Sequence, residues 1–388
     1  MKGACLAACT LFFLVLPTIG QAQQLAFPGA EGAGRYSAGG RGGKTLRVTN
    51  LNDNGPGSLR AAVQVKQPRI IIFDVAGTIR LKSDLVIDSP RITIDGSTAP
   101  AQGIAIADHG LIVKADDVVI RYFRSRLGDQ GGGQGDAIWI ARGSRIILDH
   151  VSASWSVDET LSASARYDDG GIYDLTVQWS IIAESLRRAG HAKGEHGYGS
   201  LIRGGRGARF SFHHNLWAHH VARMPRPGNY ASAAMDPIGP LIEFRSNIFY
   251  NWGGTASGYN ADSASNATYA FIDNAYVSGP DSKGQTAFRE ENALARSWFA
   301  GNIMNGTAPA DPWSLVTGSG VRLTAAPDIA PVKSDPAASA YKRVLAEAGA
   351  SRARDAVDRR IVESVIRRSG RIIDSQSDVG GWPVLAEK

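Results

Sequence analysis

The chain has 388 residues, of which 43% are hydrophobic and 20% charged, and it contains 45 glycines and 17 prolines. This composition is too apolar for a disordered polymer, and it is too rich in glycine for a helical bundle, since glycine averages about 7% in proteins. The formal net charge of +6 permits a polyanionic partner. Many arginines lie in the C-terminal tail, however, so the charge alone gives no reason to expect nucleic-acid binding.

Residues 1–22 have the pattern of a secretory signal that is removed after Ala22. Lys2 precedes an apolar run at residues 11–16, and the segment ends in small residues. The apolar run is too short to span a membrane. Leu-Ala-Ala-Cys9 resembles a lipoprotein signal, but here the apolar run follows the cysteine instead of preceding it. We therefore expect a secreted protein, extracellular or periplasmic, without a membrane anchor.

Short runs of β-branched and aromatic residues recur along the rest of the chain. Each run is about five residues long and has the apolar or alternating pattern of a strand with a buried face. The segments between the runs are rich in glycine, aspartate, asparagine and serine. Repeats of 20 to 50 residues are typical of stacked coils. The runs are residues 69–73, 91–95, 118–122, 145–149, 175–179, 209–213, 241–244 and 269–272.

A second periodicity has the same spacing. Asn215, Asn247, Asn274 and Asn302 each stand two residues before a large apolar side chain, at steps of 32, 27 and 28 residues. Asparagine favours turns because its side chain forms hydrogen bonds with nearby backbone. One asparagine at the same corner of each coil would stack into a ladder. The two periodicities together predict a right-handed parallel β-helix over residues 23–330.

Residues 331–388 differ from the repeats and form a predicted C-terminal extension that is partly helical. Residues 339–348 and 354–366 have helical spacing, and Val357, Ile361 and Val365 form an apolar stripe one turn apart. We expect these helices to pack against the β-helix, as helices at the end of a solenoid usually do.

The densest group of polar residues runs from Asp129 to Arg226, and three interpretations of it compete. Histidines 213, 214, 219 and 220 could bind a transition metal, but adjacent residues on a strand point to opposite faces. Asp168 and Asp169 could be hydrolytic carboxylates, although their glycine-rich surroundings indicate a turn. Acidic residues on successive coils could instead hold Ca²⁺, with arginines on a later coil binding an acidic sugar.

Several motifs in this order resemble polysaccharide lyase family 1, the pectate lyases. The resemblance covers essentially the whole chain after residue 25, and it implies a parallel β-helix, secretion and Ca²⁺-assisted β-elimination of polygalacturonate. The motifs that carry it are Ala26-Phe-Pro-Gly-Ala-Glu-Gly-Ala-Gly-Arg35, Gly135-Asp-Ala-Ile138, Leu148-Asp-His-Val-Ser-Ala-Ser-Trp-Ser-Val-Asp-Glu159, Phe212-His-His-Asn215, Ala222-Arg-Met-Pro-Arg226, Arg354-Asp-Ala-Val-Asp358 and Gly380-Gly-Trp-Pro383.

The resemblance assigns roles to two arginines. Arg223 matches the arginine that takes the proton from C5 of the uronate, and Arg226 matches one that grips the substrate carboxylate. A guanidinium is ordinarily no base. Its pKa must therefore be lowered by neighbouring positive charge, while Ca²⁺ on the substrate carboxylate makes the C5 proton more acidic.

The resemblance also implies a Ca²⁺ site. Asp136 and Asp158 match ligand positions, and Ser162 stands where the family usually has a second acid. Gln134 replaces another family carboxylate, so we expect weaker Ca²⁺ binding or a site that the substrate completes. A lysine of the family has no clear counterpart; His196 or Tyr198 is expected to contact the substrate in its place.

Two alternatives stay open at this stage. The missing carboxylates would suit a pectin lyase-like enzyme that acts on methylated substrate without Ca²⁺. A non-catalytic polysaccharide-binding β-helix would keep the repeats, but it would have no reason to keep Arg223, Arg226 and Asp136 together. We favour a monomeric pectate lyase whose partner is an acidic polysaccharide, and no feature suggests nucleic acid or a membrane as a partner.

Overall fold

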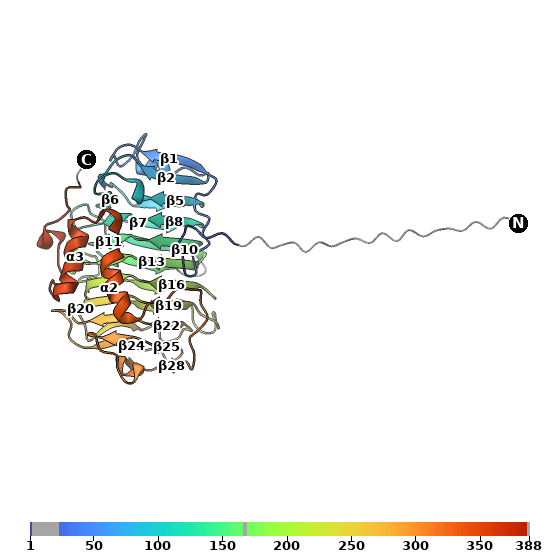
Figure 1. Cartoon of the computed structure of the whole chain (residues 1–388), viewed down its shortest axis with the longest axis vertical. Coiled ribbons are helices and arrows are strands. Elements are labelled where there is room, and N and C mark those ends of the chain that lie inside the picture. Colours follow the sequence, from blue (N-terminus) through green and yellow to red (C-terminus); the bar gives the residue numbers. More distant parts are fainter. Residues whose placement is uncertain (2–22, 166–168, 386–388) are drawn as a thin grey trace.

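The computed structural model describes Met1 and residues 23–165 and 169–385, so residues 2–22 of the predicted secretory signal lie outside the described part of the chain. Parallel strands stack coil upon coil from β1 at one end to β28 at the other (Figure 1). The predicted parallel β-helix is thereby confirmed. The eight predicted runs all become strands of one long sheet, which explains why they recur once per coil.

Three parallel sheets form the walls of the β-helix. The long sheet contains β1 (Lys44–Val48), β2 (Arg69–Phe73), β5 (Ile92–Asp95), β8 (Val118–Arg121), β10 (Ile138–Asp149), β13 (Ile172–Gln178), β16 (Arg209–His213), β19 (Leu241–Arg245), β22 (Thr268–Ile272), β25 (Arg296–Ala300) and β28 (Val321–Arg322). The second sheet contains β3 (Gly77–Arg80), β6 (Ile104–Ala107), β9 (Arg124–Arg126), β11 (Ser152–Ser154), β14 (Ile181–Ala183), β17 (Leu216–His220), β20 (Ile248–Trp252), β23 (Ala275–Val277) and β26 (Ile303–Met304).

The third wall carries the functional site. It contains β4 (Leu85–Ile87), β7 (Leu111–Lys114), the first part of β10, β12 (Leu161–Ser164), β15 (Leu201–Arg203) and β18 (Arg226–Gly228). β10 pairs with this wall through its first residues and with the long sheet through its last ones, so it bends around a corner. A smaller parallel sheet contains β21 (Ala256–Asn260), β24 (Thr286–Glu290) and β27 (Val316–Gly318).

The interior is filled by like residues that stack from coil to coil. Phe212, Phe244, Phe271 and Phe299 form a column with ring centroids 5.6, 4.9 and 4.5 Å apart. Each ring lies in the same register position of its strand. Burying one such ring contributes about 2–3 kcal/mol, so the column provides a large part of the apolar stabilisation of these coils.

The predicted asparagine ladder is present. The Nδ2 of Asn215 donates to Asn247 Oδ1 at 3.2 Å, that of Asn247 to Asn274 Oδ1 at 3.0 Å, and that of Asn274 to Asn302 Oδ1 at 2.9 Å. Each Oδ1 also accepts a backbone N–H of the preceding coil. The amides satisfy buried backbone groups at the corner that would otherwise lack partners.

The N-terminal segment at residues 26–43 lies flat across the coils, which explains its glycines. An added Cβ would lie 2.0 Å from Ile146 O at Gly34 and 1.9 Å from Arg69 O at Gly40. The Gly34 amide donates to Thr176 Oγ1 at 2.9 Å. Glycine is required here because the backbone approaches the strand edges closely.

The C-terminal helices cover the outer face of the second sheet, as predicted (Figure 1). Val357, Ile361 and Val365 are buried in one cluster with residues of β14, β17 and β20. Asp355 begins α3 because its carboxylate accepts the Asp358 amide at 3.0 Å. The helices are α1 (Leu59–Val63), α2 (Ala337–Glu347) and α3 (Ala356–Arg367), with 3₁₀ turns η1 (Gly96–Thr98), η3 (Pro312–Leu315), η4 (Ser351–Ala353) and η5 (Gln376–Val379).

Candidate active site

A pocket of about 470 Å³ opens beside the third wall, at the corner that precedes its strands. Four successive coils bring polar residues to this corner. Asp136 precedes β10, Asp158 and Glu159 precede β12, Tyr198 precedes β15, and Arg223 precedes β18. Isolated parallel bridges join Glu159 to Tyr198 and Tyr198 to Ala222, so the coils are in register there. Residues more than 80 positions apart in the sequence therefore meet on one surface.

The acidic part of the pocket consists of Asp136, Asp158 and Glu159. One carboxylate oxygen of each lies within 4.8 Å of those of the other two. Burial raises the pKa of Asp136 well above its ordinary value, and the Asp158 charge raises it further, although a Ser162 hydrogen bond and Arg223 oppose the rise. Among the described residues, neither Asp136 nor Asp158 forms an ion pair with lysine or arginine. Within this cluster, in the described part of the chain, only Glu159 has an arginine partner, Arg223.

A divalent cation with oxygen ligands fits this set. Ca²⁺ takes oxygen ligands at 2.3–2.6 Å, so oxygens that share one ion are separated by distances of the size seen here. The backbone N–H of Glu159 donates to Asp136 Oδ1 at 3.2 Å, which fixes the orientation of that carboxylate. Ser162 Oγ accepts the Leu201 amide at 3.2 Å on the same wall. The imidazoles of His191 and His196 also face Asp158, so its carboxylate has nitrogen donors as well as oxygen donors beside it.

Arg223 lies between the acidic group and an aromatic ring. Its Nη1 forms an ion pair with Glu159 Oε1, and its guanidinium carbon lies 4.0 Å from the centroid of Tyr198. The side chains of Arg223 and Glu159 are only 16% and 6% exposed, so water screens this pair weakly. The ring and the carboxylate hold the guanidinium at one position beside the acidic group.

Arg226 is the first residue of β18, three residues after Arg223. Its Nη2 lies 3.3 Å from Asp262 Oδ1, while Arg203 Nε donates to Asp262 Oδ2 at 2.7 Å. The Asp262 carboxylate thus contacts both arginines and holds them next to each other on the third wall. A pair of guanidiniums held in this way can bind carboxylates of a ligand, because each presents donors in a planar fork.

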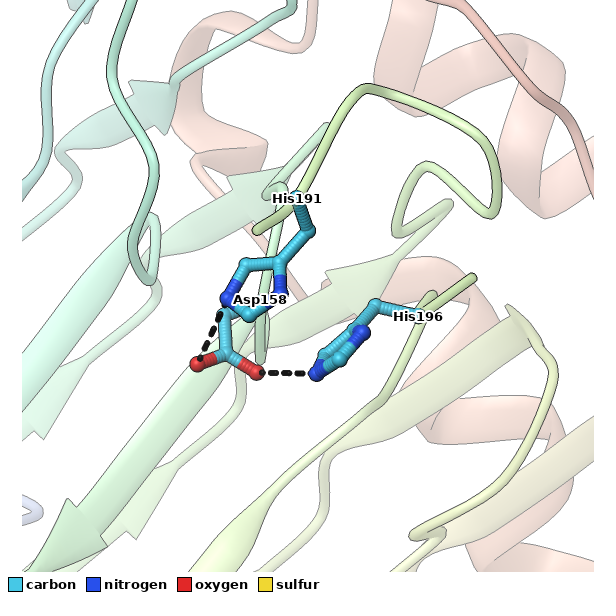
Figure 2. A group of neighbouring side chains, drawn as sticks. All are labelled: Asp158, His191 and His196. Carbon is cyan, nitrogen blue, oxygen red and sulfur yellow. Dashed lines mark ion pairs between the residues drawn. The ribbon is translucent and has the colours of Figure 1, made fainter. Parts of the chain in front are cut away.

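His196 lies on the loop before β15, opposite Asp158. Its Nε2 is 3.6 Å from Asp158 Oδ1, and its ring centroid is 5.0 Å from that of Tyr198. His191 on the same loop approaches the other carboxylate oxygen, with its Nε2 3.7 Å from Asp158 Oδ2. Figure 2 shows the carboxylate between the two imidazoles.

The sequence-predicted site residues are brought together. Asp136, Asp158, Ser162, His196, Arg223 and Arg226 line the pocket, and Tyr198 lies under Arg223. Sequence reasoning missed other lining residues, namely Trp139, Glu159, Lys193, Arg203 and Tyr230. Trp139 follows the Gly-Asp motif by three residues and pairs with Ser162 in the third wall, so the motif itself could have pointed to it.

Other candidates lie elsewhere. His219 and His220 are buried with partners of their own, Ser364 Oγ at 2.8 Å and Ser185 Oγ at 2.6 Å. His213 and His214 contact each other through their Nδ1 atoms at 3.0 Å. Asp168 lies outside the described residues. Asp169 lines a second pocket of about 600 Å³, which shares Trp139, Ser164 and Tyr230 with the first, so the two pockets adjoin as one groove.

Comparison with curated proteins finds relatives along most of the chain. Probable pectate lyase C of Aspergillus terreus is 36% identical over 373 residues, which cover 92% of this chain and 81% of that protein. The protein of the same name from Emericella nidulans is 37% identical over 372 residues, covering 92% and 80%. No family model matches the chain.

Solved structures share the fold at low sequence identity. A pectate lyase studied for its substrate specificity and anti β-elimination mechanism has a TM-score of 0.61 at 15% identity, covering 86% of this chain and 99% of that one. A Bacillus sp. N165 pectate lyase in complex with trigalacturonate has a TM-score of 0.58 at 13% identity, covering 82% and 98%. The solved structures show that the fold is shared, and the sequence relatives show the family. The chain belongs to the pectate lyases, which are polysaccharide lyases.

Proposed function

We propose that this protein cleaves polygalacturonate by Ca²⁺-assisted β-elimination in the groove of the third wall. The observation that carries the proposal is the placement of Arg223 beside a cluster of three carboxylates within one pocket, two of which, Asp136 and Asp158, have no lysine or arginine partner among the described residues. A groove made of two adjoining pockets suits a polymer, and Arg203, Arg226 and Lys193 in the first pocket suit an acidic one. A non-catalytic binding protein would need the arginines but not the acidic cluster.

Asp136, Asp158, Glu159 and Ser162 are the residues that would hold Ca²⁺. When bound, Ca²⁺ supplies positive charge that neutralises the substrate carboxylate and makes the neighbouring C5 proton more acidic. Arg226 binds a uronate carboxylate through its guanidinium, and His196 and Tyr198 contact the sugar. The position of Arg226 and His196 in the pocket lining supports these roles, and so does the contact of Tyr198 with Arg223.

Arg223 takes the C5 proton in its neutral form, after its guanidinium has given one proton to solvent. The C5–H electrons form the C4=C5 double bond, the C4–O bond breaks, and the departing oxygen takes up a proton. Glu159 opposes the first step, because its contact with Arg223 favours the charged guanidinium. Its carboxylate also belongs to the acidic cluster. Glu159 thus takes part in both the ion pair and the acidic cluster, and we expect its ion pair with Arg223 to weaken before the proton is transferred.

Ultraviolet absorbance of the unsaturated product tests the proposal. We expect absorbance to grow with polygalacturonate and Ca²⁺, to stop with a chelator, and to fall by about 10²–10⁴-fold in Arg223→Lys, the range that a positioned general base contributes. Arg245→Lys is the matched control. Arg245 also pairs with a glutamate, with Nε 3.1 Å from Glu243 Oε2, but it lies on the long sheet, away from the pocket.

The outcomes separate the alternatives. Full activity with the chelator would refute the Ca²⁺ assignment and favour a pectin lyase-like reaction, which methylated pectin as substrate would reveal. No product from pectate, methylated pectin or other uronans, with the groove still binding polysaccharide, would favour the non-catalytic alternative. Wild-type activity of Arg223→Lys would refute the role of Arg223.

We further propose that residues 1–22 direct secretion, that residues 23–330 form the catalytic β-helix, that residues 331–388 form an extension packed on it, and that the protein is a monomer. No helix within the described ranges has both the length and the apolarity needed to cross a membrane. Mass spectrometry of the exported protein would test the first point, since cleavage after Ala22 predicts Gln23 at the N-terminus.

A further inference from the structure

The loop that joins β14 to β15 places two imidazoles on either side of one carboxylate. His191 and His196 face separate oxygens of Asp158 at 3.7 and 3.6 Å (Figure 2). Their ring centroids are 3.8 Å apart, and their side chains are only 9% and 10% exposed. One ligand atom of each of the three residues lies within 4.8 Å of those of the other two. The cluster mixes nitrogen and oxygen donors, unlike the acidic cluster beside it.

The His196 ring is oriented in the way that metal-binding imidazoles are. Its Nδ1 lies 3.1 Å from Gly194 O and must carry a proton to donate to this carbonyl. In the neutral ring the Nε2 lone pair then faces Asp158 Oδ1. Two acceptors that face each other repel, and a metal ion between them would remove this repulsion. A backbone carbonyl on the far nitrogen is the usual outer partner of a metal-ligating histidine.

His191 can bind a metal ion at the same place after a small change in its hydrogen bonds. Its Nδ1 accepts the Lys193 amide at 3.1 Å, so the neutral ring carries its proton on Nε2, toward Asp158. Metal binding at Nε2 moves that proton to Nδ1 and releases the Lys193 amide. Lys193 is exposed, so water can accept this N–H in place of the ring. Glu195 pairs with Arg188 at 2.7 Å and does not compete for the imidazoles.

The loop is anchored before any ligand arrives. Leu186 forms a parallel bridge with Ile373 of the C-terminal extension, and Arg187 Nε donates to Asp374 Oδ1 at 2.9 Å. The His196 amide donates to Arg187 O at 2.9 Å, which closes the loop on itself. The two histidines are thus held near each other by backbone contacts rather than by the metal, which lowers the entropy that binding must overcome.

We propose that Asp158, His191 and His196 bind a divalent transition-metal ion of borderline softness, for which Zn²⁺ is the reference. Two ligand atoms at 2.0–2.1 Å from a tetrahedral ion are about 3.4 Å apart, close to the separations of 3.6 and 3.7 Å seen here. Two imidazoles and one carboxylate are a known zinc ligand set that leaves a fourth position open, whereas Ca²⁺ prefers oxygen ligands only.

Asp158 belongs to both clusters, so the two ions exclude each other. Zn²⁺ on the histidines withdraws this carboxylate from the oxygen ligands beside Asp136. This part of the inference rests on the proposed Ca²⁺-assisted function: Zn²⁺ should inhibit pectate cleavage, and added Ca²⁺ should relieve the inhibition. Binding of Zn²⁺ itself does not depend on that function.

Calorimetric titration of the untagged, metal-free protein with ZnCl₂ tests the site. We expect one Zn²⁺ per chain, with affinity at least tenfold lower in His191→Asn and in His196→Asn. The matched control is His109→Asn, because His109 Nδ1 also faces a single carboxylate, Asp84 Oδ1, at 3.6 Å but has no second imidazole. This variant should bind Zn²⁺ as wild type does. Circular dichroism verifies that each variant is folded.

A second measurement needs no variant. Electron spin echo spectroscopy of the Cu²⁺-loaded wild type should show modulation from the remote nitrogens of two imidazoles. No Zn²⁺ binding at micromolar concentration, unchanged affinity in both histidine variants, or no imidazole modulation would overturn the site. Zn²⁺ and Ca²⁺ binding independently would overturn the shared role of Asp158. If the protein had no lyase activity, calorimetry and spectroscopy would still decide the metal site.

Discussion

A buried ionic cluster fixes the C-terminal helix to the β-helix, and it gives the sharpest stability prediction. Arg126 Nη2 donates to Asp355 Oδ1 and to Asp358 Oδ1, both at 2.9 Å, and Arg124 Nε lies 3.4 Å from Asp355 Oδ2. None of the four side chains is more than 1% exposed. The arginines lie on β9, and the aspartates lie 229 or more positions later in the chain.

Asp355→Asn should destabilise the protein by about 3–5 kcal/mol, because it leaves two buried arginines, Arg124 and Arg126, with Asp358 as their one carboxylate. Asparagine keeps the cap of α3, since Asn and Asp cap helices about equally well. Asp355→Ala also loses the cap hydrogen bond to Asp358 N and should cost about 1 kcal/mol more. Arg367→Gln is the control: Arg367 and Glu363 pair on the same helix but are 72% and 48% exposed, so the change should stay within about 0.5 kcal/mol.

Urea unfolding followed by circular dichroism measures these differences, and hydrogen exchange of the α3 amides shows whether the helix detaches first. A loss below about 1 kcal/mol in Asp355→Asn, with α3 still protected, would refute the reasoning. Acid provides a second check. Burial would raise the pKa of Asp355, but Arg126 lowers it to about 2. This corresponds to about 2 kcal/mol of stability that is present above pH 4 and lost as pH falls toward 2.

Two further predictions concern buried polar groups. Asn247→Ala should cost about 2–4 kcal/mol in urea unfolding, because it leaves Phe212 O and the Asn215 amide unsatisfied in the interior; a loss no larger than that of the half-buried Asn305→Ala would contradict this. Burial raises the pKa of Glu290 from its ordinary value of 4.5 to about 8. Between these pH values the Glu290 carboxyl is therefore protonated in the folded protein but ionised in the unfolded chain. Stability should therefore fall as pH rises from 4.5 to 8. Glu290→Gln should lack this fall and exceed wild type at pH 9, and parallel pH profiles would contradict it.

The sequence predicted one wall of the β-helix far better than the others. Strands of the long sheet alternate Ile, Val and Phe, so their pattern is visible in a window of five residues. β9 is Arg-Ser-Arg, and β11 is Ser-Ala-Ser, and both are fully buried. Such strands have no local signal, because partners remote in sequence determine their burial. The arginines of β9 are buried only because Asp355 and Asp358 return to meet them.

The same distinction applies to the site. Asp136 and Arg223 stand in motifs, and the stacking of coils then brings them to one pocket. His191 stands in no motif, and its place opposite Asp158 depends on a loop whose path is fixed by Ile373 and Asp374 near the other end of the chain. The partnership of Glu159 with Arg223 likewise required the register between coils, which spacing along one strand does not reveal.

Because like residues stack from coil to coil, one whole coil is the step by which the length of this fold can change. Asn247 and Asn274 occupy the same corner of adjacent coils, as Phe244 and Phe271 occupy the same place in the column. Removing residues 244–270, one whole coil, would place Asn215 against Asn274 and Phe212 against Phe271, with each contact replaced by its like. The β-helix can therefore grow or shrink by whole coils, whereas a gain or loss of a few residues within a strand would put every later column out of step. We therefore expect gains or losses shorter than one coil to be tolerated only in the loops, such as the loop between β14 and β15 that carries His191 and His196.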